Sequence, residues 1–82
     1  MRDGVYSMKI DFQQQVRNVD TKVVFADKNF FININGFQLE CILIGGIYEV
    51  NIMKNYITFR SYKVDEEDII IFLMYFKSKT DT

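Results

Sequence analysis

The chain has 82 residues, of which 49% are hydrophobic and 16% aromatic. This length permits one domain with its own core, since independent folding is common above roughly 60 residues. Ten basic and eleven acidic residues give a net charge of -1, and the basic residues are scattered along the chain. Nucleic-acid binding through phosphate contacts depends on clustered Lys and Arg, so we do not expect direct nucleic-acid binding.

Few residues are suited to catalysis or metal binding. The chain has no His and a single Cys, Cys41, so a zinc site of the usual ligands cannot be assembled. His is also the usual general base that activates a Ser or Cys nucleophile, and the sequence has none. Gly45-Gly46 is not followed by the Lys-Ser/Thr of a phosphate-binding loop. We therefore predict a protein that is not an enzyme and has no cofactor or metal.

The sequence also bounds the cellular location. The longest apolar runs are residues 42–44 and 69–76, far below the ~20 residues that span a bilayer. Met1-Arg2-Asp3-Gly4 does not lead into a signal-peptide apolar region, and a lone Cys is compatible with a reducing compartment. We expect a cytoplasmic protein that does not contact the membrane.

The N-terminal part of the chain predicts strands. Residues 5–12 alternate between polar and apolar side chains, which predicts a first strand with one buried face. Residues 13–21 are polar and weakly patterned, so we expect a loop with at most one helical turn. A loose turn at 27–29 would then join a strand at 22–26 to a strand at 30–34.

The clearest hairpin is centred on Asn35-Gly36, a pair that tolerates the positive φ angles of a type I′ turn. With this turn, the predicted cross-strand pairs on one face are Ile34 with Phe37, Ile32 with Leu39, and Phe30 with Cys41, and Asn33 faces Gln38 on the other. The apolar pattern and the turn residues agree on this register.

Two further turns are expected in the second half of the chain. A turn at Lys54-Asn55 would pair Ile52 with Ile57 and Val50 with Phe59 on the buried side. It would also place Glu49 opposite Arg60, a pair worth roughly 0.2 to 1 kcal/mol. Gly45-Gly46 is typical of a tight bend or bulge, and a close approach of the backbone to a ligand is the functional alternative.

The segment from Asp65 to Phe76 combines four acids with eight apolar residues. As a helix over 66–78, it would have Asp65 as its N-cap and acids in its first turn. As a strand, it would follow an acidic hairpin loop and fold back on residues 56–64. Three consecutive Ile with nearby Phe and Tyr favour the strand.

That strand would be apolar on both faces. The second face would hold a candidate interface formed by Tyr62, Ile71, Leu73 and Tyr75. An exposed apolar surface of this kind needs a cover, which could be the loop 13–21, the curvature of a barrel or a second copy of the chain. A homodimer is therefore one hypothesis.

Three segments resemble the GrlR family, small lipocalin-like barrel proteins that repress type III secretion genes. The similar residues are Asp3-Gly4-Val5-Tyr6-Ser7, Gly46-Ile47-Tyr48-Glu49-Val50 and Asp65-Glu66-Glu67-Asp68-Ile69-Ile70-Ile71. The resemblance implies a regulator without catalysis that neutralises a transcriptional activator through its acidic loop.

We therefore predict an all-β fold, a single domain over 1–82 built as an antiparallel meander of about six or seven strands. The resemblance adds a small lipocalin-like barrel, closed or incomplete, and a β-sheet with a C-terminal helix at 66–78 is the alternative. The predicted function is a negative regulator that binds a basic protein, such as a transcription factor, and the predicted partner-binding residues are Asp65, Glu66, Glu67 and Asp68.

Two other functions stay open from the sequence. A small inhibitor protein of a phage or mobile element would present the same acidic loop. A small-molecule-binding β-barrel is suggested by the aromatic content, although we expect the interior to be filled by Phe12, Phe25, Phe30, Phe37, Phe59 and Phe72.

Overall fold

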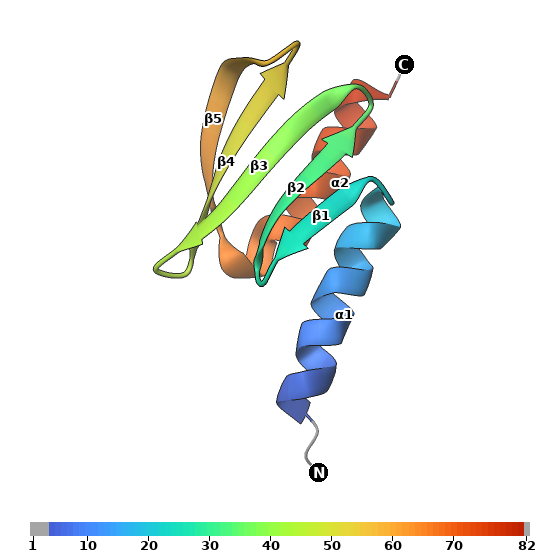
Figure 1. Ribbon diagram of the computed structural model, residues 1–82, viewed down its shortest axis with the longest axis vertical. Coiled ribbons are helices and arrows are strands. Elements are labelled where there is room, and N and C mark those ends of the chain that lie inside the picture. Colours follow the sequence, from blue (N-terminus) through green and yellow to red (C-terminus); the bar gives the residue numbers. More distant parts are fainter. Residues whose placement is uncertain (1–3, 82) are drawn as a thin grey trace.

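The computed structural model describes the backbone of residues 4–81 and the side chains of residues 12–81. In chain order the elements are α1 (Gly4–Val19), β1 (Val23–Ala26), β2 (Asn29–Ile34), β3 (Phe37–Ile44), β4 (Ile47–Lys54), β5 (Ile57–Asp65), the short 3-10 helix η1 (Glu66–Asp68) and α2 (Ile69–Thr80). The strands form one antiparallel sheet in sequence order. In Figure 1, α2 crosses behind this sheet, and α1 lies near the β1 edge with its N-terminal part projecting beyond the strands.

The core lies between one face of the sheet and the two helices. Inward side chains alternate along the central strands, as a sheet with one covered face requires. The fully or almost fully buried side chains are Val16, Val19, Phe30, Ile32, Ile34, Leu39, Cys41, Tyr48, Val50, Ile52, Ile69 and Leu73. Four of these come from the helices, so the helices complete the core that the sheet begins.

The hairpin at Asn35-Gly36 is confirmed in turn and register. Ile34 pairs with Phe37, Ile32 with Leu39, Phe30 with Cys41, and Asn33 with Gln38. Asn35 and Gly36 both have positive φ, at 51° and 88°.

The other predicted turns are right in kind but differ in detail. Gly45 and Gly46 form a two-residue turn with φ of 57° and 79°, which is the tight bend expected there. The loose turn at 27–29 is a tight one, because Ala26 pairs directly with Asn29.

The predicted turn at Lys54-Asn55 is wrong by one residue. The turn residues are Asn55 and Tyr56, so Lys54 pairs with Ile57. A turn of this kind needs positive φ at its first position, which Asn adopts at less cost than Lys. A register shift at Ile52/Met53 then restores the alternation of faces, and Glu49 faces Lys63 instead of Arg60.

Tyr56 has a φ of 66° and is 98% exposed, so its strained backbone has no compensating burial. We expect Tyr56→Gly to raise the free energy of unfolding by up to about 1 kcal/mol, because glycine adopts this conformation without a Cβ clash. Urea denaturation measures the change. Tyr56→Ala is the matched control, since it removes the same ring but keeps the Cβ. A gain of equal size in Tyr56→Ala would contradict this explanation.

The predicted strand at 5–12 and loop at 13–21 are wrong, because one helix, α1, runs through both. Residues 5–12 alternate with period two, but a helical spacing of apolar residues begins at Phe12. Phe12, Val16 and Val19 are four and three residues apart, and the last two are buried against the core. This burial selects the helix.

The strand predicted after the acidic residues is also wrong, and the alternative of a C-terminal helix is confirmed as α2. Ile69 and Leu73 lie one helical turn apart and are 1% and 0% exposed. Covering the apolar face of the sheet outweighs the β-propensity of the three consecutive Ile residues. The result is an open five-stranded sheet with two helices instead of a barrel of six or seven strands.

The open sheet changes the expected role of the Phe residues. Phe30 is buried, and Phe12, Phe25, Phe37 and Phe72 pack against the core without being fully enclosed. Phe59, in contrast, is 53% exposed on β5. These rings therefore fill the space between the sheet and helices, as expected for core residues, with Phe59 as the exception.

Contacts at both ends fix the position of α2. At its start, Glu66 N–H donates to the Gly46 carbonyl over 2.9 Å. At its end, Asn35 Nδ2 donates to the Lys77 carbonyl and to Thr80 Oγ1, both at 3.0 Å, and Lys77 Nζ donates to the Val19 carbonyl. The helix is therefore held by two hairpin turns and by the end of α1.

Candidate functional site

The four consecutive acids do not form the tip of a hairpin. Asp65 is the last residue of β5, and Glu66–Asp68 form η1, which leads directly into α2. Negative charge at this position interacts favourably with the positive end of the helix dipole. Asp65 occupies the predicted N-cap position, at the start of η1, and Asp68 is the N-cap residue of α2, but neither side chain makes a capping hydrogen bond.

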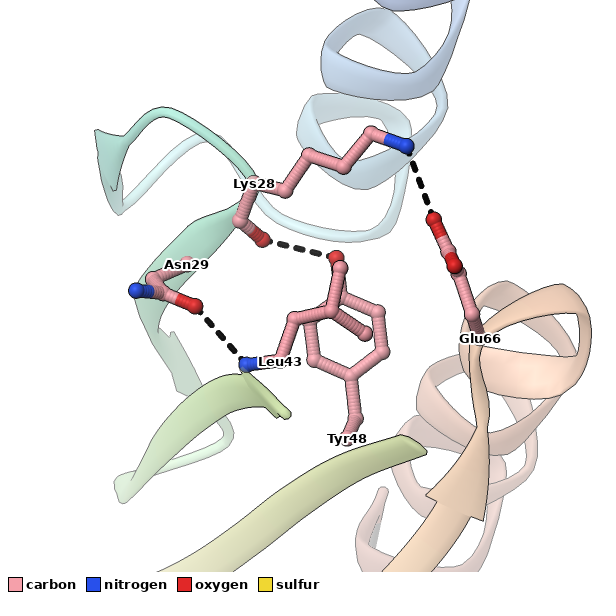
Figure 2. Close-up of polar contacts among 5 residues, drawn as sticks. All are labelled: Lys28, Asn29, Leu43, Tyr48 and Glu66. Atoms are coloured by element: carbon pink, nitrogen blue, oxygen red, sulfur yellow. Dashed lines mark hydrogen bonds and ion pairs between the residues drawn. The ribbon is translucent and has the colours of Figure 1, made fainter. Parts of the chain in front are cut away.

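One of the acids is anchored to a neighbouring turn. Lys28 Nζ donates to Glu66 Oε2 over 2.8 Å, and both side chains are partly exposed. The hydrogen bond and charge of Glu66 raise the pKa of Lys28 above its usual value. This contact ties the β1–β2 turn to the start of α2 (Figure 2).

Partly buried hydrogen bonds hold the same turn from the other side. Tyr48 is fully buried, and its hydroxyl donates to the Lys28 carbonyl over 2.7 Å. Asn29 Oδ1 accepts a 2.7 Å hydrogen bond from the backbone N–H of Leu43 (Figure 2). Burial raises the pKa of Tyr48 above its usual range, so the hydroxyl stays a donor. The β1–β2 turn, the β3–β4 turn and η1 therefore form one connected end of the sheet.

The remaining acidic side chains face solvent. Asp65, Glu67 and Asp68 are exposed, and within residues 12–81 no side-chain hydrogen bond or ion pair engages their carboxylates. Asp65, Glu66 and Glu67 line an open hollow of about 460 Å³ together with Gly46. We call this the acidic hollow. Asp68 does not line it.

The predicted interface of four apolar residues is not one continuous face. Tyr62 lies on β5, where its ring packs 5.5 Å from that of Phe72 and is 40% exposed. Leu73 is 0% exposed and belongs to the core, so it is not available on the surface. Ile71 and Tyr75 face solvent from α2. The helical period separates residues that a strand would have aligned.

An exposed and mostly apolar row on α2 is visible only once the helix is known. It consists of Ile71, Met74, Tyr75 and Ser78, spaced as one face of a helix, and we call it the α2 stripe. The first three residues are 67%, 59% and 61% exposed. A helix that is apolar on nearly all sides is normally buried on all sides. The sequence signal was the length of the apolar run, which exceeds what one buried face needs.

An open groove of about 630 Å³ follows the stripe between α1 and α2. It is lined by Gln15, Asn18, Val19, Ile70, Met74, Lys77, Ser78 and Asp81. Its lining combines the apolar side chains of Val19, Ile70 and Met74 with polar ones, a mixture also found at surfaces that bind another protein.

Among the side chains that the structure describes, those of residues 12–81, no group of three His, Cys, Asp or Glu is arranged to hold a metal ion. No helix in the described part of the chain is long and apolar enough to cross a membrane. The five strands form an open sheet, so the barrel interior that the small-molecule alternative requires is not formed by the described residues.

Comparison with protein-family models, curated proteins and solved structures finds no match to this chain. The resemblance to the GrlR family therefore stays a prediction. Of the residues that carry it, Asp3 lies outside the described residues and Gly4 to Ser7 lie in α1. The second segment runs from Gly46 in the β3–β4 turn into β4, and the third runs from the end of β5 through η1 into α2.

Proposed function

We propose that this protein is a non-enzymatic protein-interaction module that acts as a negative regulator. The acidic hollow binds a Lys or Arg side chain of a basic protein, such as the transcriptional activator that the GrlR resemblance implies. One observation carries the proposal. Asp65 and Glu67 are exposed and unpaired beside a carboxylate, that of Glu66, which Lys28 holds in place.

The anchoring supports recognition because it fixes the carboxylates before the partner arrives. Glu66 is held through its side chain by Lys28 and through its backbone by Gly46. A preorganised site loses less conformational entropy on binding than a mobile acidic loop would. The hollow can therefore favour a cation without first ordering its own backbone.

The distribution of charge supports the same function. Lys77 and Lys79 lie in the last turn of α2, and Lys54 lies at the end of β4. Figure 1 shows these two places at the end of the sheet opposite η1. Lys28 offsets the charge of Glu66, but these other basic residues lie too far away to offset Asp65 and Glu67, whose field can speed the approach of a basic partner.

The test compares partner binding by the wild type and by the variant Asp65→Asn/Glu67→Gln. A partner is first captured from the native host, identified by mass spectrometry and purified. Exposed ion pairs contribute roughly 0.2–1 kcal/mol each, so we expect the affinity to fall about 2- to 30-fold. The remaining binding should depend less on salt, because fewer charges are screened.

Glu49→Gln/Asp81→Asn is the matched control, since it also removes two exposed carboxylates but leaves the hollow intact. We expect it to bind nearly as tightly as the wild type. Equal affinity of the hollow variant and the wild type would contradict the proposal. The identity of the captured protein also separates a regulator of the host from an inhibitor encoded by a phage or mobile element.

A further inference from the structure

We infer that the α2 stripe is the interface of a homodimer in which α2 packs antiparallel to α2 of a second copy. The two-fold axis passes close to Met74. This inference is independent of the acidic hollow, because the stripe faces away from the sheet along the helix and the hollow lies at the end of the sheet.

The first step is that the large apolar side chains of the stripe are exposed to solvent. Ile69 and Leu73 already supply the contacts that fix α2 on the sheet, and both are at most 1% exposed. Ile71, Met74 and Tyr75 contribute nothing to that packing and remain mostly in water. Burying exposed apolar area is favourable by about 25 cal/mol per Å², so a partner that covers them is stabilised.

The second step is that the stripe is complementary to itself in shape. In an antiparallel pair with its axis near Met74, Ile71 of one copy lies opposite Ser78 of the other. Met74 lies opposite Tyr75 in the same register. Large side chains thus meet smaller or flexible ones, which allows close packing of two helices.

The third step is charge, which decides the orientation. Asp68 precedes the stripe and Lys79 follows it, eleven residues or roughly 16 Å further along the helix axis. Both lie on the same side of the stripe as Tyr75, and Lys79 Nζ sits 5.7 Å from the centre of the Tyr75 ring. An antiparallel pair places each Asp68 beside the partner's Lys79. A parallel pair would put each Asp68 level with the partner's Asp68 on the opposite flank and far from the partner's Lys79, so this pairing of opposite charges would be lost.

The fourth step is the size of the interface. A stable dimer buries about 800 Å² on each copy, more than one stripe of three apolar side chains supplies. The two-fold axis also brings the α1 helices together on the other side of the stripe. There Gln15 and Asn18 are exposed on the rim of the groove between α1 and α2. The dimer would be a four-helix layer between two sheets, with both outer sheet faces free.

The experiment is sedimentation equilibrium of the purified full chain over a range of concentrations. We expect a mass of twice 9.8 kDa for the wild type. The variant Met74→Glu places two like charges at the two-fold axis, and we expect its dimer dissociation constant to rise at least about 100-fold. Its circular dichroism should match the wild type, because Met74 is 59% exposed. Ile57→Glu is the control, at an equally exposed site on β5, and should leave the dimer intact.

A charge exchange tests the antiparallel orientation. Asp68→Lys alone and Lys79→Asp alone should each weaken the dimer on the order of tenfold, because each places like charges at both symmetry-related contacts. The double variant Asp68→Lys/Lys79→Asp should restore the wild-type dissociation constant. A parallel dimer would show no such restoration.

The inference is overturned if the wild type is monomeric up to about 0.5 mM, weaker than any stable dimer. It is also overturned if Met74→Glu dimerises as well as the wild type. Partner binding through the acidic hollow is measured separately with Met74→Glu. If Met74→Glu is monomeric and still binds the partner, both proposals are supported. If the wild type is monomeric but binds the partner through the acidic hollow, only the dimer is overturned.

Discussion

Leu73→Ala should lower the free energy of unfolding by about 2–5 kcal/mol, the range for removing a buried Leu side chain. Leu73 is 0% exposed and lies at the centre of the α2 face that covers the sheet. Its loss would leave a cavity between α2 and the strands, and α2 cannot easily move to close it. Both ends of α2 are held, by Glu66 at its start and by Asn35 at its end. Urea denaturation followed by circular dichroism measures the change.

Ile57→Ala is the size-matched control. It removes the same number of carbon atoms from a side chain that is 68% exposed on β5. We expect it to lower the free energy of unfolding by less than about 1 kcal/mol, since little packing is lost. Equal losses in the two variants would mean that α2 does not cover the sheet as described.

The protein should lose stability steeply in alkaline solution above pH 9. Burial raises the pKa of the Cys41 thiol from 9.0 to about 12, and it also raises that of Tyr48. Below pH 9 both states hold the thiol proton, so the stability is fully present. Above pH 9 the unfolded chain releases that proton while the folded chain keeps it, which favours unfolding. Between pH 9 and pH 11, Cys41 alone should remove on the order of 2–3 kcal/mol.

The measurement is the free energy of unfolding in urea at several pH values, for the wild type and for Cys41→Ala. The variant is less stable overall because of its cavity, so the slope with pH is compared instead of the absolute value. Its slope between pH 9 and pH 10 should be smaller by about 1 kcal/mol per pH unit, the contribution of one proton. Parallel slopes would show that the thiol is not shielded from solvent. In the folded wild type, Cys41 should also react slowly with thiol reagents.

The hairpins were the most predictable part of the fold because their information is local. Asn35-Gly36 combines two residues that tolerate positive φ with strands whose apolar residues alternate on both sides. Gly45-Gly46 gives the same signal. Turns at residues 54–55 and 55–56 were both compatible with the local sequence. The observed turn at 55–56 is accompanied by a bulge at Ile52/Met53, which no short sequence pattern specifies.

The helices were harder to predict because local preference and tertiary contacts disagree. Residues 69–71 are three Ile, which prefer a strand, and yet Ile69 packs on the sheet from a helix. In α1, Val16 and Val19 gain their burial from contact with the sheet and α2. The choice between helix and strand in these two segments depends on the apolar face of the sheet, which the helices cover.

The candidate site also has features that the sequence predicts and features that it does not. The acidic residues and their exposure to water follow from the sequence, because four adjacent charges cannot all be neutralised in so small a domain. Their partners do not follow, since Lys28 is 38 residues from Glu66 and meets it only through the folding of the sheet. The α2 stripe was likewise hidden, because a strand and a helix group the same apolar residues on different faces.

Composition and local sequence pattern were enough to predict a meander of hairpins and an exposed acidic segment. These features depend on composition and on neighbouring residues. The folded chain was needed to show that residues 4–19 and 69–80 are helices, that the acids lie at a connected end of the sheet, and that α2 keeps a mostly apolar row exposed to water. Those features depend on which surfaces must cover one another, and this is set by contacts between residues far apart in the chain.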